Sequence, residues 1–173
     1  MNGMKKIPPT DEETGNINVI IDTPKGSRNK YSWDERLGLF ALKGVLAAGH
    51  VFPYDFGYIP GTLGGDGDPL DVLVIGDEPT FTGCLVLVRL IGIIEAEQRE
   101  LDGETERNDR LIGVQADSPT HQRITSINDL DKTLVDNIEH FFISYNEAKG
   151  KSFKPLGRYA ARKAQDALEK FML

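Results

Sequence analysis

Three aspartates, Asp66, Asp68 and Asp71, lie within one short stretch of the chain, residues 64–71, together with three glycines and a proline. The glycines remove side-chain bulk, and the proline fixes one backbone angle. Carboxylates this close together repel, so they stay ionised at neutral pH only if a cation binds among them, unless one of them takes up a proton. The spacing therefore indicates a cation site, and the apolar run that follows, residues 72–75, predicts a buried strand as its platform.

Two simpler interpretations of this stretch are a solvated turn and a calcium loop. Gly, Asp and Pro dominate ordinary turns, but a turn does not require the third aspartate. In a calcium loop of the EF-hand type that starts at Asp66, Leu70 would occupy a ligand position and Asp71 the position of the required glycine. The spacing excludes the EF-hand and favours a cation site of another kind.

Residues 66–74 resemble the signature of the family I soluble inorganic pyrophosphatases, in which the pattern D-x-D-P-x-D precedes a core strand. The resemblance extends from about Ile17 to about Lys151 and includes the aromatic stretch at residues 52–60. It implies a hydrolase that splits pyrophosphate into two phosphates by direct attack of a metal-activated water. It also implies that Asp68, the middle carboxylate, is the general base.

The resemblance implies a cofactor of several Mg²⁺ ions per site, with Mn²⁺ or other divalent ions as alternatives, because an all-oxygen shell suits them. The implied ligands are all aspartates: Asp66, Asp71, Asp102, Asp22 and Asp109. Asp22 stands where the family usually has glutamate. Asp109 is a substitute ligand, because the family's D-x-K triplet is Asn-Asp-Arg at residues 108–110 and Asn108 carries no charge.

The resemblance further implies that basic and phenolic side chains bind the substrate: Lys30, Lys43, Tyr58, Arg110, Tyr145 and Lys151. The chain departs from the family at Gly44, which aligns with a phosphate-binding arginine, at Phe56, where many relatives have tyrosine, and at Asn146, usually lysine. Similar side chains one or a few positions away suggest the hypothesis that the site has been rebuilt. Lys43 and Asp109 are the test cases for that hypothesis.

Several elements must position these residues. Apolar runs predict strands at residues 17–22, 31–33, 39–46, 84–94 and 110–114, and a charged hairpin connection at residues 95–107. Residues 51–62, rich in aromatics, proline and glycine, predict a packed loop that lines a cleft. An apolar stripe from Leu134 to Tyr145, ended by Gly150, predicts a helix, and a second one is expected from about Arg158 to Phe171.

The predicted fold is mostly β within the α+β class: a five-stranded OB-like closed barrel, as the resemblance implies, with two helices packed outside. Residues 1–173 form a single domain of ordinary length, and residues 1–15 are expected to be a flexible arm. The family also implies a homo-oligomer, most often a hexamer in bacteria. The sequence alone does not give the oligomeric state.

The composition narrows the function classes. The net charge of -7 disfavours a nucleic-acid binder, no apolar segment is long enough to span a membrane, and the single cysteine, Cys84, fits a reducing cytoplasm. The three histidines lack the spacing of a metal site or a catalytic triad. Two alternatives stay open: a diverged metal-dependent phosphohydrolase acting on another polyphosphate, and a non-catalytic barrel that binds cations or single-stranded nucleic acid.

Overall fold

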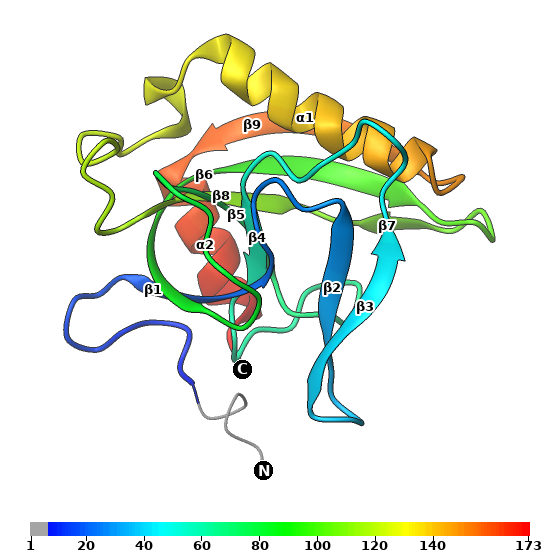
Figure 1. Cartoon of the computed structure of the whole chain (residues 1–173). Coiled ribbons are helices and arrows are strands. Elements are labelled where there is room, and N and C mark those ends of the chain that lie inside the picture. Colours follow the sequence, from blue (N-terminus) through cyan, green and yellow to red (C-terminus); the bar gives the residue numbers. More distant parts are fainter. Residues whose placement is uncertain (1–6) are drawn as a thin grey trace.

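Five strands close into a ring in the structure, a computed structural model that describes residues 7–173 (Figure 1). They are β1 (Ile17–Thr23), β4 (Asp55–Tyr58), β5 (Asp71–Ile75), β8 (Arg110–Gln115) and β6 (Leu85–Arg99). Each pairs with the next in that order, and β6 pairs back with β1. All of these pairings are antiparallel except β5 with β8. The expected five-stranded closed barrel is confirmed.

The long strand β6 extends beyond the ring and carries two further strands. Its last residues pair with β7 (Thr105–Arg107) on one edge, and β9 (Ser152–Ala160) pairs with residues 92–99 on the other. The sequence analysis did not predict β9, and its start for the second helix was wrong because Arg158 lies in this strand. Pro155 and Gly157 disfavour a helix there, and the free edge of β6 offers the backbone hydrogen bonds of a strand.

The prediction of a loop across residues 51–62 was also wrong, because this stretch contains β4. Gly57 permits the pairing of β4 with β1: a Cβ at this position would lie 2.2 Å from the carbonyl oxygen of Ile20. Asp55 anchors the start of the strand by accepting hydrogen bonds from the backbone N–H groups of Lys25 (2.7 Å) and Thr80 (3.0 Å). Residues 51–62 therefore contain a short buried strand, although their aromatic and turn residues predict a loop.

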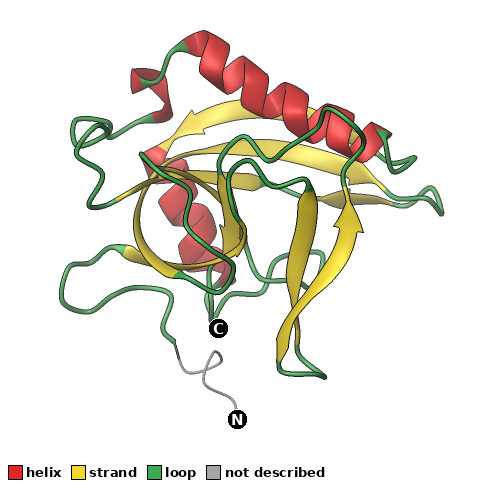
Figure 2. Cartoon of the chain, viewed as in Figure 1, coloured by secondary structure: helices red, strands yellow, loops and turns green. Residues whose placement is uncertain are grey.

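Strands β2 (Asn29–Asp34) and β3 (Leu39–Val45) form a separate two-stranded hairpin that projects from the barrel, as Figures 1 and 2 show. Lys30 is opposite Gly44 in this hairpin, and the register shifts immediately after that pair. We call this hairpin the arm. Its outer strand exposes three large apolar side chains, Leu39, Leu42 and Val45.

Two helices cover the sheet. Helix α1 (Lys132–Glu147) follows the short 3-10 helix η2 (Ile127–Asp129) and packs on β9, whereas α2 (Ala161–Phe171) packs against β6 (Figure 2). One core cluster joins α1 to the barrel through side chains such as Phe56, Ile94 and Phe142, and a second joins α2 to it through Val72, Ile93 and Leu168. Neither helix has the length and apolar character needed to cross a bilayer in the described part of the chain.

The N-terminal segment that we expected to be flexible, residues 1–15, is described from residue 7 onward, and its first six residues lie outside the described range. Residues 7–15 contact β1: the side chain of Asn18 donates to the carbonyl of Pro8 (2.9 Å), and its backbone N–H donates to the carbonyl of Pro9 (2.8 Å). This part of the chain is therefore hydrogen-bonded to the barrel.

Candidate active site

The aspartate stretch connects β4 to β5 as a hydrogen-bonded loop. The N–H of Gly64 donates to the carbonyl of Asp68 (2.7 Å), and the N–H of Asp68 donates to the carboxylate of Asp66 (3.1 Å). Gly67 has a φ of 86°, which favours glycine over residues with a side chain. The loop thus holds Asp66 and Asp68 on the surface and places Asp71 at the first position of β5.

The carboxylates of this loop and of β1 influence one another. Burial raises the pKa of Asp68, and the negative charges of Asp66 and Asp71 raise it further. Burial likewise raises the pKa of Asp71. Asp22, buried near the end of β1, has its pKa raised to about 6 by burial, with the Lys30 ammonium acting in the opposite direction. The site therefore concentrates negative charge that no basic residue fully balances.

Lys30 brings a positive charge from the arm to these carboxylates. Its ammonium lies 3.2 Å from the Asp22 carboxylate and 4.5 Å from the centroid of the Phe56 ring. Two tyrosines lie close enough for these charges to act on their pKa values. Burial and the Asp22 charge raise the pKa of Tyr58 to about 12. Burial also raises the pKa of Tyr145. The structure thus brings these three predicted substrate ligands to the aspartate cluster.

Arg110, the first residue of β8, is buried beneath the cluster. Its guanidinium contacts the carboxylate of Asp71 and the side-chain oxygen of Asn108. Three rings surround the guanidinium carbon at 5.3–5.9 Å from their centroids, those of Phe56, Phe142 and Phe153. Its Nε is the one buried side-chain nitrogen or oxygen without a hydrogen-bond partner in residues 7–173. Arg110 is therefore held between a carboxylate and an aromatic wall.

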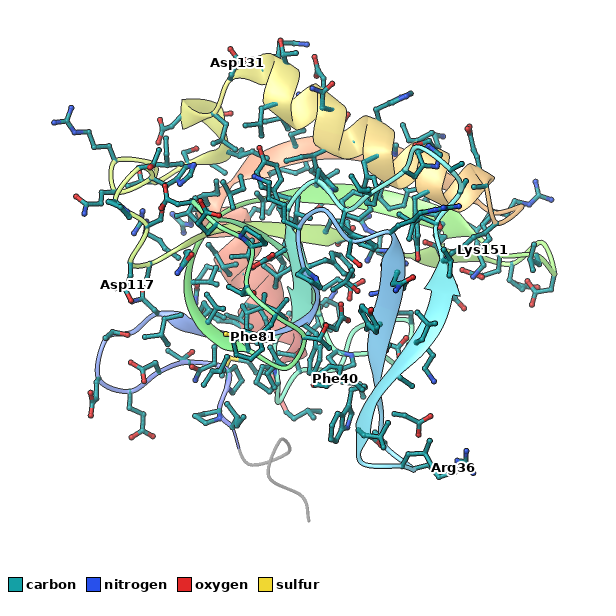
Figure 3. The ribbon with its side chains drawn as sticks, in the orientation of Figure 1. Arg36, Phe40, Phe81, Asp117, Asp131 and Lys151 are labelled. Carbon is teal, nitrogen blue, oxygen red and sulfur yellow. The ribbon has the colours of Figure 1, made fainter. Side chains whose placement is uncertain are left out.

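A row of polar side chains continues from Arg110 along β6. Asn108 donates to the side-chain oxygen of Gln98 (3.0 Å), Gln98 donates to Glu100, and Glu100 pairs with Lys151. Lys151, labelled in Figure 3, lies just beyond the end of α1. The sequence analysis missed Gln98 and Glu100. The available signal was a polar residue, Gln98, on the face of β6 that is otherwise apolar.

Three predicted site residues have partners outside the cluster. Lys43 lies 3.3 Å from Asp34 on the exposed arm. Asp109 accepts hydrogen bonds from the backbone N–H of Ala96 (3.0 Å) and from Arg107 (2.6 Å). Asp102 lies at the exposed hairpin turn and accepts from the N–H of Glu104 (3.0 Å).

Asn146, which aligns with a family lysine, is buried in α1. Its side-chain amide donates to the carbonyl of Phe142 (2.8 Å). Lys149, one turn beyond Tyr145, contacts the hydroxyl of that tyrosine and lies 4.0 Å from its ring centroid. The basic residue beside Tyr145 is therefore Lys149 and not residue 146.

The donor set fits a divalent cation that retains water. In residues 7–173 no three carboxylate, imidazole or thiol groups converge into a ready-made metal shell. Burial raises the pKa values of Asp22, Asp68 and Asp71, with neighbouring carboxylates adding to the effect, and a divalent cation bound beside them would stabilise their ionised forms. Magnesium commonly binds through one or two carboxylates plus waters and substrate phosphates. A few carboxylates that do not form a complete metal shell in residues 7–173 match that requirement.

A second polar group, at the opposite end of β5, does not form a nucleophilic site. Ser118 contacts the Asp77 carboxylate and lies 2.7 Å from Nδ1 of His121. In a catalytic triad the histidine lies between the hydroxyl and the acid, whereas here the serine lies between them and is buried. The arrangement of Ser118, Asp77 and His121 is therefore not that of a catalytic triad.

The comparisons with known proteins agree on one family. The sequence profile of the inorganic pyrophosphatase family matches residues 19–173. An inorganic pyrophosphatase of Synechocystis is 43% identical over 149 residues, which cover 86% of this chain and 85% of that relative. The crystal structure of the inorganic pyrophosphatase of Thermus thermophilus superposes with a TM-score of 0.86 at 34% identity, over 96% of this chain and 94% of the other. That from Helicobacter pylori gives a TM-score of 0.86 at 32% identity, over 96% of each.

Proposed function

This chain belongs to the inorganic pyrophosphatase family and hydrolyses pyrophosphate to phosphate, and we propose that it does so with magnesium at the cluster around Asp71. The observation that carries this assignment is the convergence of Asp22 and Lys30 with Asp71 and Arg110, two oppositely charged pairs from four different strands. Acidic side chains hold a divalent cation, and basic ones hold the anion that the cation accompanies.

The reaction requires this mixture of charges. Pyrophosphate is a compact polyanion, so water attacks it slowly unless the charge on its oxygens is neutralised. Bound magnesium would supply positive charge to those oxygens and lower the pKa of a coordinated water. In this proposal Asp66, Asp71 and Asp22 hold the metal, directly or through water. Asp68, at the surface of the loop, accepts the proton of the attacking water.

The basic and phenolic residues orient the two phosphates. Lys30 and Arg110 both lie within contact distance of the Phe56 ring, and each already pairs with a carboxylate of the cluster. Tyr58 and Tyr145 supply hydroxyl donors whose raised pKa values keep them protonated. In this proposal Lys151 acts through Glu100. No covalent intermediate on the protein is needed.

Asp102, Asp109 and Lys43 would each have to leave a present partner to reach metal or substrate. We therefore expect their substitution to affect turnover less than substitution of Asp71 or Arg110. These present partners weaken the hypothesis that Asp109 and Lys43 replace the family residues that are missing at neighbouring positions.

The proposal includes a homo-oligomer, in the form of a hexamer. Each subunit is a single domain, and the protein is located in the cytoplasm. The exposed apolar side chains of the arm support subunit contacts, because monomers rarely expose large apolar groups side by side. Cys84 is a free thiol, which suits a reducing compartment.

The first test is phosphate release from pyrophosphate with and without Mg²⁺, in the parent protein and in Asp68→Asn. We expect release that requires the metal and falls about 10²- to 10⁴-fold in the variant, the usual contribution of a general base. Asp117→Asn, at an exposed position after β8, is the matched control and should retain activity. Equal rates in the parent and Asp68→Asn would refute the role of Asp68, and metal-independent release would refute that of magnesium.

A further inference from the structure

A pocket of about 520 Å³ opens beside the aspartate cluster, between the arm and the end of α1. Its lining combines two kinds of side chain. The basic side chains are Lys30, Lys149 and Lys43, of which Lys43 pairs with Asp34, and the apolar ones include Val45, Leu46 and Ala148. A pocket with cations at some positions and apolar walls at others is suited to a ligand that is anionic at one end and apolar at the other.

Gly44 keeps this pocket open. It lines the pocket directly opposite Lys30 in the arm, and a Cβ placed on it would meet no heavy atom within 4 Å. Its backbone does not have the positive φ that would require glycine. The position therefore has room for a long side chain, and the absence of one leaves space beside the Lys30 ammonium.

The pocket and the aspartate cluster share two residues. Lys30 lines the pocket while its ammonium lies 3.2 Å from the Asp22 carboxylate. Tyr145 lines the pocket as well, and its hydroxyl is close enough to Lys30 and Arg110 for their charges to act on its pKa. A phosphate bound between these residues would have one oxygen directed to the cluster and another directed into the pocket.

We propose that this site also accepts diphosphate monoesters, in which one of the two phosphates carries an organic group that enters the Gly44 pocket. The proposal rests on the proposed function, because the same residues perform the chemistry. Charge complementarity favours this ligand class: the cationic groups match the diphosphate, and the apolar surface matches the organic group. The volume suits a group of the size of a phenyl ring or a nucleoside, since ligand pockets usually span about 300–1,000 Å³.

The reaction is the one assigned to pyrophosphate, with one substituted product. Water adds to the terminal phosphorus, and the bond from that phosphorus to the bridging oxygen breaks. The electron pair of that bond remains on the bridging oxygen, which leaves as part of an organic monophosphate. The proton of the water passes to Asp68 and then to solvent, so the products are one phosphate and one monophosphate ester and no further reactant is needed.

The test compares phenyl diphosphate with pyrophosphate in the full-length protein with Mg²⁺. We expect the parent to release phosphate from both. Gly44→Met places a long, uncharged side chain in the pocket and should lower the ratio of kcat/KM for phenyl diphosphate to kcat/KM for pyrophosphate by about 10- to 100-fold, the range of a steric effect in a binding pocket. Gly44→Ala adds only a methyl group in open space and should leave that ratio within about twofold of the parent.

Inhibition supplies a second measurement that needs no variant. Phenyl phosphate should inhibit pyrophosphate turnover by the parent at least about tenfold more strongly than inorganic phosphate, because only the ester reaches the apolar surface of the pocket. Equal inhibition by the two would overturn the inference even if Gly44→Met failed to fold.

The remaining outcomes separate the inference from the function on which it rests. Turnover of pyrophosphate without turnover of phenyl diphosphate overturns the inference alone. A folded parent that turns over neither compound overturns both. An unchanged ratio in a folded Gly44→Met overturns the assignment of the organic group to this pocket.

Discussion

At the scale of single residues, Asp22 shows how burial sets the charge of the site. Its carboxylate lies within the barrel wall with Lys30 as its ion-pair partner, yet burial outweighs that partner and raises its pKa to about 6. In the unfolded chain the same group would titrate near 3.8. Without a metal, ionised Asp22 therefore destabilises the fold relative to its protonated form.

This predicts a pH-dependent advantage for Asp22→Asn in the metal-free protein. Well below pH 3.8, at about pH 3, the aspartate is protonated in both states, so it has no effect on stability. Between about pH 4 and 6 Asp22 ionises in the unfolded chain but stays protonated in the folded one, so the parent loses stability as the pH rises. At 1.36 kcal/mol per pKa unit, the total loss is about 3 kcal/mol. The amide introduced by the substitution does not ionise, so the variant should exceed the parent by that amount at pH 8, and the difference should shrink as the pH falls and vanish near pH 3.

Urea unfolding in EDTA at pH 4, 5, 6 and 8 measures this difference, with Asp117→Asn as a control of constant stability. A gap between Asp22→Asn and the parent that does not change with pH would contradict the prediction. Added magnesium should narrow the gap at pH 8, because only the parent carries the carboxylate that the cation stabilises.

The extent to which the site could be predicted also varies residue by residue. The loop carboxylates and Lys30 were identifiable because their spacing or their place in the family signature is preserved. Asp109 could not be placed from sequence, since a shift of one residue turns a strand side chain to the other face. Its bonds to Arg107 and Ala96 depend on how β6 and β7 pair. Glu100 was missed because its link to Lys151 joins two segments distant in sequence.

At the scale of elements, a charged clamp fixes α1 to β9. Arg158 on the strand contacts both carboxylate oxygens of Glu139 (2.6 and 2.9 Å) and one of Asp136 (2.5 Å) on the helix. Because β9 in turn pairs with β6, this clamp also positions the helix end that carries Tyr145.

Arg158→Lys should therefore lower the free energy of unfolding by about 1–2 kcal/mol, because an ammonium cannot bond Glu139 bidentately. Lys132→Met is the control on the same helix: Lys132 also pairs with Asp136, at 2.8 Å, but its side chain is 83% exposed, so less than about 0.5 kcal/mol is expected. Urea unfolding midpoints for the two variants measure the difference. Equal losses would show that the clamp has no special role.

The elements that sequence reasoning found and missed differ in how their stability arises. Strands β1, β5, β6 and β8 each contain a short, mostly apolar run that is buried, so burial alone predicts them. Strand β4 is short and contains Gly57, and β9 alternates apolar with polar residues around Pro155. Strands β4 and β9 form because a neighbouring strand has an edge that needs a hydrogen-bonding partner. The local sequence of β4 or β9 does not show where that edge lies.

At the scale of the whole molecule, the exposed apolar surface of the arm predicts how subunits associate. Leu42 is 56% exposed and Val45 59% exposed, near each other on β3. Leu42→Glu should therefore dissociate the oligomer into smaller species in analytical ultracentrifugation, because a buried unpaired carboxylate costs several kcal/mol per contact. Leu101→Glu, at the hairpin turn on another part of the surface, should leave the sedimentation coefficient unchanged. A parent that sediments as a monomer would contradict the proposed oligomer.

The four partners of β6 also constrain the order in which the chain can mature. Strand β1 precedes β6, β7 and β8 follow it, and β9 is synthesised near the end of the described sequence. A nascent chain that has completed β8 can close the barrel, but one edge of β6 remains unpaired until β9 has left the ribosome. An open apolar edge of this kind recruits other chains. Yield in the cell should therefore depend on chaperones and on translation speed between β8 and β9, a segment that contributes no aspartate to the proposed metal site.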